Sequence, residues 1–411
     1  MAAAGPSARP LWRDRNFGIF WAAQTLSVAG DSFAYIAIPL LVLHATGSVA
    51  QMGLLTGIGG AASVGAGIFA GVLADRLDRR TLLICCDLAR MVLYGITALA
   101  WSFGPEVWLL YVVLPACEAI GMVFQVTYVT AVRNLTGGDR VTEANGLLYA
   151  TATAAGVLGP LLAGLVSGAF GPTAAIAIDA ASFALSAAGA AATRLSGQRG
   201  PGPAARRRPW TELLAGAGFL WRQPVLRALT VALTFFIFLT YGLTDVLIYY
   251  LRHDLGQSYA TVGLVLAIAA AGPVGGSLVV ARLRRAIGFG ACWIGGVTVS
   301  GIAIACLGAS RSVPAIAALA AVYLGCSSIG GICSMSLRQQ VTPDHLLGRV
   351  TSAFWTVHFS LGPAGAAVLT WTAGRYGVGP VCAAAGAGCL LIAAAALFTP
   401  IRRPTPELAS G

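Results

Sequence analysis

Lysine is absent from this sequence, so all 26 basic residues are arginines. A P-loop nucleotide site needs a lysine on the phosphates, and a Schiff-base enzyme needs an amine. The chain can support neither chemistry. Charged residues are also scarce: they make up 10% of the 411 residues, whereas a soluble domain carries about 25%. The sequence therefore has too little polar surface for a water-soluble globule of this length.

Metal and redox chemistry also lack their usual sequence patterns. The nine cysteines lie in apolar runs without a CxxC pair or a Cys/His metal spacing. We interpret them as small packing residues. The four histidines (His44, His253, His345 and His358) are scattered along the chain. No cofactor or metal is therefore expected, and no nucleophile–base pattern indicates an enzyme.

Long apolar runs fill most of the chain, which is 57% hydrophobic and has a mean hydropathy of +0.79. Each run is near the ~20 residues that cross a ~30 Å hydrocarbon layer as a helix. The twelve runs are 17–43, 49–73, 81–103, 107–131, 143–170, 172–193, 226–251, 261–281, 289–309, 313–337, 350–373 and 379–398. They predict an all-α polytopic membrane protein with twelve transmembrane helices.

The arginines are distributed unevenly between the two sides of such a protein. When the loops are assigned alternately, 22 arginines lie on one side, and only Arg252, Arg311 and Arg375 lie on the other. The last one, Arg90, lies within a predicted span. The positive-inside rule places the arginine-rich side, with both termini, in the cytoplasm. The net charge of +11 is then explained by topology and by contact with anionic membrane lipids, and no nucleic-acid partner is expected.

The chain repeats itself after 205 positions. Gly71, Leu73, Arg79 and Arg80 recur as Gly276, Leu278, Arg284 and Arg285, each in a polar hinge after the second apolar run of its half. Arg133 and Asp139 recur as Arg338 and Asp344 at the same spacing. The repeat predicts two pseudo-symmetric six-helix bundles. The predicted divisions are a cytoplasmic lead (1–16), the N-terminal bundle (17–193), a linker with an amphipathic helix on the inner leaflet (194–225), the C-terminal bundle (226–399) and a cytoplasmic tail (400–411). For the linker, a flexible tether is the alternative.

These motifs resemble the major facilitator superfamily. The hinge 71–80 is similar to the signature that follows the second helix in that family, and 156–164 is similar to the helix-five signature of its drug:proton antiporters, with Gly156, Gly159, Pro160 and Gly164. The stretches 139–146, 178–180 and 343–350 look like the macrolide-efflux and enterobactin-exporter branch. The resemblance covers roughly residues 13–400 and implies the major facilitator fold, with rocking of two halves about a central site.

The resemblance also implies a cytoplasmic gate built around the hinge. Its candidate residues are Gly71, Asp75, Arg76, Arg79, Arg80, Asp87, Arg90, Arg133 and Asp139. Asp75 can accept hydrogen bonds from the N-terminus of the following helix and pair with arginine. Asp87 and Arg90 are three residues apart on one helix face, which we interpret as an ion pair supporting the gate. The alternative is that the hinge is a charged stop that only sets topology.

Five ionisable residues inside predicted spans are candidates for proton coupling or substrate binding, because charge is costly in the membrane interior. They are Asp31, Glu118, Asp179, Asp245 and His358. The resemblance places Asp31 and Glu118, in the first and fourth spans, at the transport pathway. Drug antiporters usually have an arginine where this chain has Glu118, so arginine-assisted proton transfer cannot operate from that position. The alternative for each of these residues is a buried hydrogen-bonding role, and for Asp179 helix packing is favoured.

Aromatic side chains dominate the spans that the resemblance assigns to the cavity. The candidates are Tyr35, Phe124, Tyr128, Phe238, Tyr241 and Trp355. Such a wall, with one or two acids, suits an amphipathic and in some cases cationic substrate. Packing or lipid-facing positions are the alternative for each ring.

The sequence thus indicates a monomeric secondary transporter of the cytoplasmic membrane. It would export drug-like or natural-product molecules by proton antiport. A siderophore exporter, a nutrient symporter and a non-transporting receptor or assembly subunit with the same fold remain open alternatives.

Overall fold

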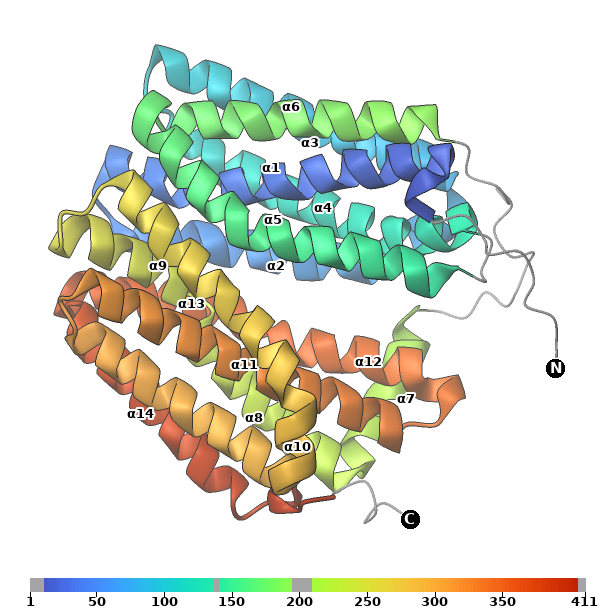
Figure 1. Ribbon diagram of the computed structural model, residues 1–411, viewed down its shortest axis with the longest axis vertical. Helices are drawn as coiled ribbons and strands as arrows, with labels where there is room; N and C mark the ends of the chain where they lie inside the picture. The colour runs from blue at the N-terminus through green and yellow to red at the C-terminus, as the bar shows by residue number, and fades with distance from the viewer. Residues whose placement is uncertain (1–10, 137–139, 194–208, 406–411) are drawn as a thin grey trace. The chain divides into compact units, whose positions relative to one another are not determined.

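Apolar sequence forms helices throughout this protein, as expected where only a helix satisfies every backbone polar group within one segment. The computed structural model describes residues 11–136, 140–193 and 209–405 (Figure 1). No strand occurs in these ranges. The elements are η1 (Leu11–Arg13), α1 (Arg15–Thr46), α2 (Val49–Arg76), α3 (Arg79–Phe103), α4 (Val107–Thr136), α5 (Val141–Phe170), α6 (Pro172–Ala192), α7 (Pro209–Arg222), α8 (Pro224–Thr240), α9 (Leu243–Tyr249), η2 (Tyr250–Asp254), α10 (Tyr259–Ala309), α11 (Val313–Val341), α12 (Asp344–Phe359), α13 (Gly362–Tyr376), α14 (Val378–Ala396) and η3 (Pro400–Arg402).

The twelve predicted spans are confirmed, although they do not correspond one to one with helices. In the described ranges, ten segments are long and apolar enough to cross a membrane. One of them, α10, contains two spans that meet at Gly288, where φ is 80° and the backbone leaves the helix. A further span is divided between α12 and α13, which are too short to be counted singly. With the second span of α10 and the span formed by α12 and α13, the described ranges contain twelve spans.

Packing divides the chain into two units. Unit 1 comprises Met1–Ile38 and Gly65–Ala204, and unit 2 comprises Pro39–Val64 and Ala205–Gly411. The units differ from the predicted bundles because 39–64, the end of α1 and the start of α2, is grouped with unit 2. Glycines on α2 explain this grouping. A Cβ built on Gly53 would lie 1.9 Å from Thr370 Oγ1, and one on Gly57 would lie 2.8 Å from the Pro363 carbonyl oxygen.

Unit 1 has its core among α1, α3, α4 and α5. Phe20, Phe124 and Ala131 are buried there, with Tyr128 packed against them. The rings of Phe20 and Tyr128 stack at 5.8 Å between centroids. On the other side of α3, α6 packs along it, as Figure 1 shows. This arrangement places α3 between α4 and α6, so that a polar residue on α3 can reach side chains from both neighbours.

Unit 2 is built around the long contact of α10 with α11, and α14 lies along α10 (Figure 1). Glycine permits close approach of the backbones: a Cβ on Gly276 would lie 2.5 Å from the carbonyl oxygen of Gly325. The linker contains the helix that its sequence predicts, α7. It packs on α12, where a Cβ on Gly216 would lie 2.2 Å from the Arg349 carbonyl oxygen. Its placement on a lipid surface stays a prediction.

Candidate functional site

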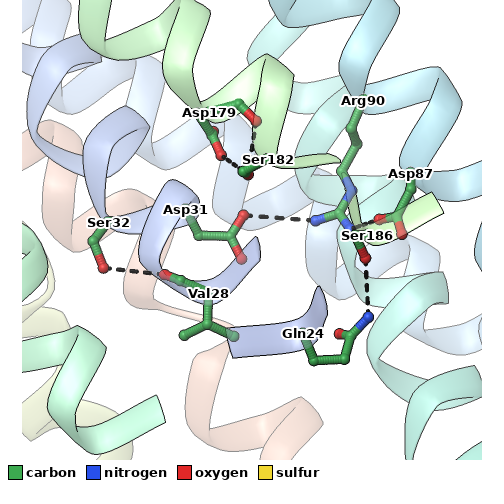
Figure 2. Close-up of polar contacts among 9 residues, drawn as sticks. All are labelled: Gln24, Val28, Asp31, Ser32, Asp87, Arg90, Asp179, Ser182 and Ser186. Atoms are coloured by element: carbon green, nitrogen blue, oxygen red, sulfur yellow. Dashed lines mark hydrogen bonds and ion pairs between the residues drawn. The ribbon is translucent and has the colours of Figure 1, made fainter. Parts of the chain in front are cut away.

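Arg90 on α3 is the centre of a charged cluster inside unit 1. Its Nη2 donates to Asp87 Oδ1 at 2.7 Å, and its Nη1 lies 3.7 Å from Asp31 Oδ1 on α1 (Figure 2). The guanidinium is also sandwiched between rings, 4.0 Å from the Phe183 centroid and 4.7 Å from that of Phe124. The predicted Asp87–Arg90 ion pair is therefore present, and a third charge from the first span joins it.

The two acids bound by Arg90 differ sharply in exposure. The Asp87 side chain is 0% exposed and that of Arg90 is 8%, whereas the Asp31 side chain is 49% exposed. A buried charge must be paired to be tolerated in an apolar interior. Asp87 is thus the fixed counter-charge of Arg90, and Asp31 is the partner that ligands or protons can reach.

A polar strip on α6 extends this cluster. Ser182 Oγ donates to the Asp179 backbone oxygen at 2.8 Å and lies 3.2 Å from Asp179 Oδ1, while Gln24 Nε2 on α1 donates to Ser186 Oγ at 2.9 Å (Figure 2). Asp179 is fully buried, and its Oδ2 has no hydrogen-bond partner among the described residues. The close approach of α1 to α6 depends on Gly30, because a Cβ there would lie 2.0 Å from Ser182 Oγ and 2.7 Å from Asp179 Oδ1.

Glu118 on α4 borders the same cluster from the opposite side. Its side chain is exposed, and the Arg90 charge acts on it. Arg90 Nη1 lies 3.9 Å from the position of a Cβ on Gly121, one turn further along α4. Although α4 has a glutamate where the drug antiporters have an arginine, α3 supplies an arginine to the neighbouring space. Asp31, Glu118 and Arg90 together form a site in which one cation faces two accessible acids.

The hinge candidates of the predicted gate are only partly described. The structure does not describe Asp139. It also leaves undescribed the side chains of Asp75, Arg76 and Arg133 and the burial of Gly71. Arg80 Nε donates to the Ala190 carbonyl oxygen at 3.2 Å, and its Nη2 donates to that of Ala191, so it caps the end of α6. Asp78 caps α3 by accepting from the Thr81 backbone N–H at 2.9 Å. Arg79, at the start of α3, is partly exposed, and a gating role for these residues stays a prediction.

The helix-five signature acts as a close-packing surface. A Cβ on Gly159 would lie 2.3 Å from Ser32 Cβ on α1, whereas a Cβ on Gly156 would meet nothing within 4 Å. Gly164 is buried. Pro160 does not interrupt α5, which continues from Val141 to Phe170.

The two remaining ionisable candidates lie in unit 2. Asp245 on α9 is buried and shares a hydrogen bond with the Thr56 side chain, while its Oδ2 has no partner. His358 on α12 is buried among rings, with centroids of Phe354 and Trp355 at 5.4 Å and 5.6 Å. Neither residue belongs to the Arg90 cluster.

The aromatic candidates take several different roles. Phe124 and Tyr128 are core residues of unit 1, and Phe124 also covers Arg90. Tyr241 packs against Gly60 and Gly362 in unit 2, and Phe238 lies against Gly365. Tyr35, one turn after Asp31, and Trp355 are exposed. The described contacts therefore favour packing for the first four and leave Tyr35 and Trp355 as accessible rings.

Sequence reasoning assigned Arg90 to the gate and missed Phe183, Ser182, Ser186 and Gln24. A signal for Arg90 existed, because it lies in the interior of a predicted span and not at its end. The serines also follow Asp179 at helical spacing, on one face of α6. No such signal identified Phe183, because nothing in one sequence tells which ring covers a charge.

Comparison with known proteins agrees with this architecture. The sequence pattern of the Major Facilitator Superfamily matches residues 20–366. The multidrug efflux pump Tap of Mycobacterium bovis is 26% identical over 354 residues, which cover 84% of this chain and 83% of that protein. The enterobactin exporter EntS of Shigella flexneri is 26% identical over 361 residues, covering 86% and 84%.

A solved structure supports the fold independently. The crystal structure of the nucleoside transporter NupG superposes with a TM-score of 0.77 at 13% identity, covering 93% of this chain and 98% of that one. At such low identity the likeness shows the fold alone. With the twelve spans and the family match over most of its length, the chain belongs to the Major Facilitator Superfamily and is a multi-pass membrane transporter.

Proposed function

We propose that this transporter exports amphipathic, drug-like or natural-product molecules by exchange with protons, through alternating access of a central site. The observation that carries the proposal is the Arg90 cluster, in which a buried cation is shared between the buried Asp87 and the half-exposed Asp31. The relatives at 26% identity are named as a multidrug efflux pump and an enterobactin exporter, which supports export as the direction.

The proposed coupling rests on competition at Asp31. A carboxylate can hold a cationic substrate or a proton, but not both at full strength. The 3.7 Å contact with Arg90 is longer than the 2.7 Å contact with Asp87. Protonation of Asp31 would therefore weaken the binding of a cationic substrate by Asp31, while Arg90 would stay paired with Asp87. Glu118, the second accessible acid beside Arg90, would pass or accept the same proton.

Orientation and assembly belong to the same proposal. The arginine-rich loops and both termini would face the cytoplasm, since charge asymmetry of this size governs insertion. The protein would act as a monomer, because each chain contains both halves of the repeat. Substrate would reach Asp31 from the cytoplasm or the inner leaflet, and protons would return from outside.

The test is substrate-driven pH change in proteoliposomes across a panel of amphipathic compounds. Asp31→Asn and Glu118→Gln should each abolish proton-coupled flux, because the amides cannot carry a proton as a carboxylate does. Asp254→Asn and Glu106→Gln are matched controls at exposed acids outside the cluster, and they should retain wild-type flux.

Two outcomes would contradict the proposal. Undiminished proton-coupled flux in both Asp31→Asn and Glu118→Gln would exclude the acids as proton carriers. Binding of compounds without movement of any compound against a gradient would indicate a receptor of the same fold.

A further inference from the structure

A second site lies inside unit 2, apart from the Arg90 cluster. It is a cavity of about 110 Å³ between α8, α10, α11 and α12. Its walls include Phe236, Trp293, Ser334, Phe354, Trp355 and His358. Drug-sized pockets measure roughly 300–1,000 Å³, and a cavity of about 150 Å³ holds one benzene ring. The cavity is smaller than one that encloses a benzene ring, so it suits the polar end of one group of a larger molecule.

Polar atoms without partners converge on this cavity. Within the part of the chain that the structure describes, Trp293 Nε1, Ser334 Oγ and His358 Nδ1 have no hydrogen-bond partner, although these residues are only 0%, 2% and 8% exposed. Buried polar atoms are normally hydrogen-bonded, and each exception calls for an explanation. Three such exceptions on one small cavity indicate a ligand group that would complete them. The indole N–H is a donor only, so at least part of that group must be an acceptor.

A buried arginine, Arg338, packs against two of the aromatic rings that line the cavity. Arg338 on α11 is 2% exposed, and its Cζ lies 3.6 Å from the Phe354 ring centroid and 5.5 Å from that of Trp355. Its Nη2 donates to Met335 Sδ at 3.1 Å, and its Nε and Nη1 have no hydrogen-bond partner among the described residues. No carboxylate lies within ion-pair distance of Arg338 in the described part of the chain. A buried charge without a counter-charge is costly, and an anionic ligand would supply that counter-charge.

We propose that this cavity binds a planar, anionic acceptor group of the exported molecule, namely an aromatic carboxylate or an ionised phenol. Trp293 and Ser334 would donate to its oxygens, and the accessible Trp355 would stack on its ring. Phe354, whose plane is 73° from that of Trp355, would contact the ring by its edge. Arg338 would balance the charge. The assignment to an exported molecule rests on the proposed function, but binding at the cavity can be measured without transport.

The test uses the full-length protein in detergent and two fluorescent probes of one shape, anthranilate (anionic) and 2-aminobenzamide (neutral), with affinity measured by fluorescence anisotropy. Wild type should bind anthranilate more tightly. Arg338→Gln should weaken anthranilate about tenfold or more and 2-aminobenzamide by less than about threefold, as expected for loss of one charged partner. Trp293→Phe should weaken both probes. Arg282→Gln and Trp371→Phe, at exposed positions outside the cavity, should change neither.

A second measurement separates binding from folding. Because Arg338 has no counter-charge among the described residues, Arg338→Gln should not lower the melting temperature of the ligand-free protein. Unchanged anthranilate affinity in Arg338→Gln would overturn the proposal. So would an equal loss of both probes together with a lower melting temperature, which would make Arg338 structural. Displacement of anthranilate by phosphatidylglycerol would also overturn it, because a lipid headgroup would then be the occupant.

The outcome is distinguishable from failure of the proposed function. Asp31→Asn should keep wild-type anthranilate affinity, because Asp31 belongs to unit 1 and takes no part in the cavity. If Asp31→Asn and Glu118→Gln both transport normally while Arg338→Gln loses anthranilate, the coupling proposal fails and the binding site stands. If flux depends on Asp31 but Arg338→Gln binds anthranilate as wild type does, the reverse holds.

Discussion

At the scale of single residues, the Arg90 cluster illustrates how a membrane protein holds charge in its interior. Arg90 is paired with Asp87 at 2.7 Å and covered on both sides by the rings of Phe124 and Phe183. Its planar guanidinium suits this arrangement, since it stacks on rings and donates at its edge. The partly exposed Asp31 therefore lies near a guanidinium, that of Arg90, whose position is fixed by other residues.

Arg90→Gln should destabilise the protein by about 3–5 kcal/mol, because it leaves the carboxylate of Asp87 buried without a counter-charge. Arg90→Lys should be less harmful, since the charge stays while the stacking and forked geometry are lost. Thermal unfolding of the purified protein in detergent measures both, with Arg282→Gln at an exposed position as the control. A melting temperature for Arg90→Gln equal to that of wild type would contradict the structural role of the pair.

Glu143 offers a pH-dependent contact outside the membrane-spanning part of α5. Its Oε1 accepts from the Leu11 backbone N–H at 3.0 Å, and its Oε2 lies 2.8 Å from Arg140 Nη2. The Leu11 hydrogen bond, followed by Arg140, holds the pKa of Glu143 below its ordinary value of 4.5. A lowered folded-state pKa means that this contact stabilises the folded form above about pH 4.5 and is lost as the pH falls through the lower value.

The protection of the Leu11 amide against hydrogen exchange, relative to its intrinsic rate at each pH, should therefore be high at neutral pH and fall below that window. Glu143→Gln should show low protection at Leu11 at every pH, because the amide cannot reproduce the charged acceptor. Exchange at Leu11 that is equally slow in Glu143→Gln would show that the contact does not hold the first turn.

At the scale of helices, glycine determines where this protein packs most closely. Gly159 on α5 faces Ser32, Gly276 on α10 faces the Gly325 carbonyl, and Gly216 on α7 faces the Arg349 carbonyl. Small residues serve this purpose in membranes, where association depends on van der Waals contact. Two helices also pass between units at residues that weaken a helix: α1 crosses at Pro39, and α2 crosses at Gly65.

Gly159→Ala and Gly156→Ala form a matched pair within α5. The first adds a methyl group 2.3 Å from Ser32 Cβ, and the second adds it in open space. Gly159→Ala should lower stability by about 1–3 kcal/mol through overpacking, while Gly156→Ala should be neutral or stabilise by about 0.5–1 kcal/mol through helix propensity. The melting temperatures of the two variants test this difference in stability. Equal values would mean that α5 can shift away from α1 without loss of stability.

At the scale of the whole molecule, the two halves repeat in sequence but have diverged in chemistry. Unit 1 contains the acids around Arg90, and the cavity of unit 2 is walled by aromatic rings and unpaired donors. The hinge diverges in the same direction, because Asp75 and Asp78 of the first copy correspond to Val280 and Leu283 in the second. The proposed transporter would then exchange protons in one half and recognise its substrate in the other.

The membrane topology can be tested with reporter fusions. Green fluorescent protein fused after Ala205, in the arginine-rich linker, should fluoresce because the arginine asymmetry retains that loop in the cytoplasm. Alkaline phosphatase fused after Ser312 should be active, because that position lies across the membrane. Activity of alkaline phosphatase at position 205 would reverse the predicted orientation.

Much of the fold could be predicted from the sequence. Apolar length and the absence of polar surface determine twelve helices, because an unpaired backbone group is not tolerated in lipid. The 205-residue repeat and the family motifs, with Gly159 and Pro160, indicated the superfamily. Candidate acids were also identifiable, since an ionisable residue within a span is conspicuous in sequence.

The tertiary structure alone decided which of those charges meet. Asp31 and Arg90 are 59 positions apart, and Phe183 is further still, so helix periodicity could pair Arg90 only with Asp87. The glutamate at position 118 looked like a departure that removed an arginine from the site, whereas packing of α3 against α4 brings Arg90 beside it. Arg338 was counted among loop charges, and only its burial against Phe354 revealed a cation without a counter-charge among the described residues. The sequence by itself determined how many helices span the membrane, because the cost of leaving backbone groups unpaired in lipid acts locally on each segment. The pairing of charges depended on the tertiary structure, because it arises from contacts between helices that are distant along the chain.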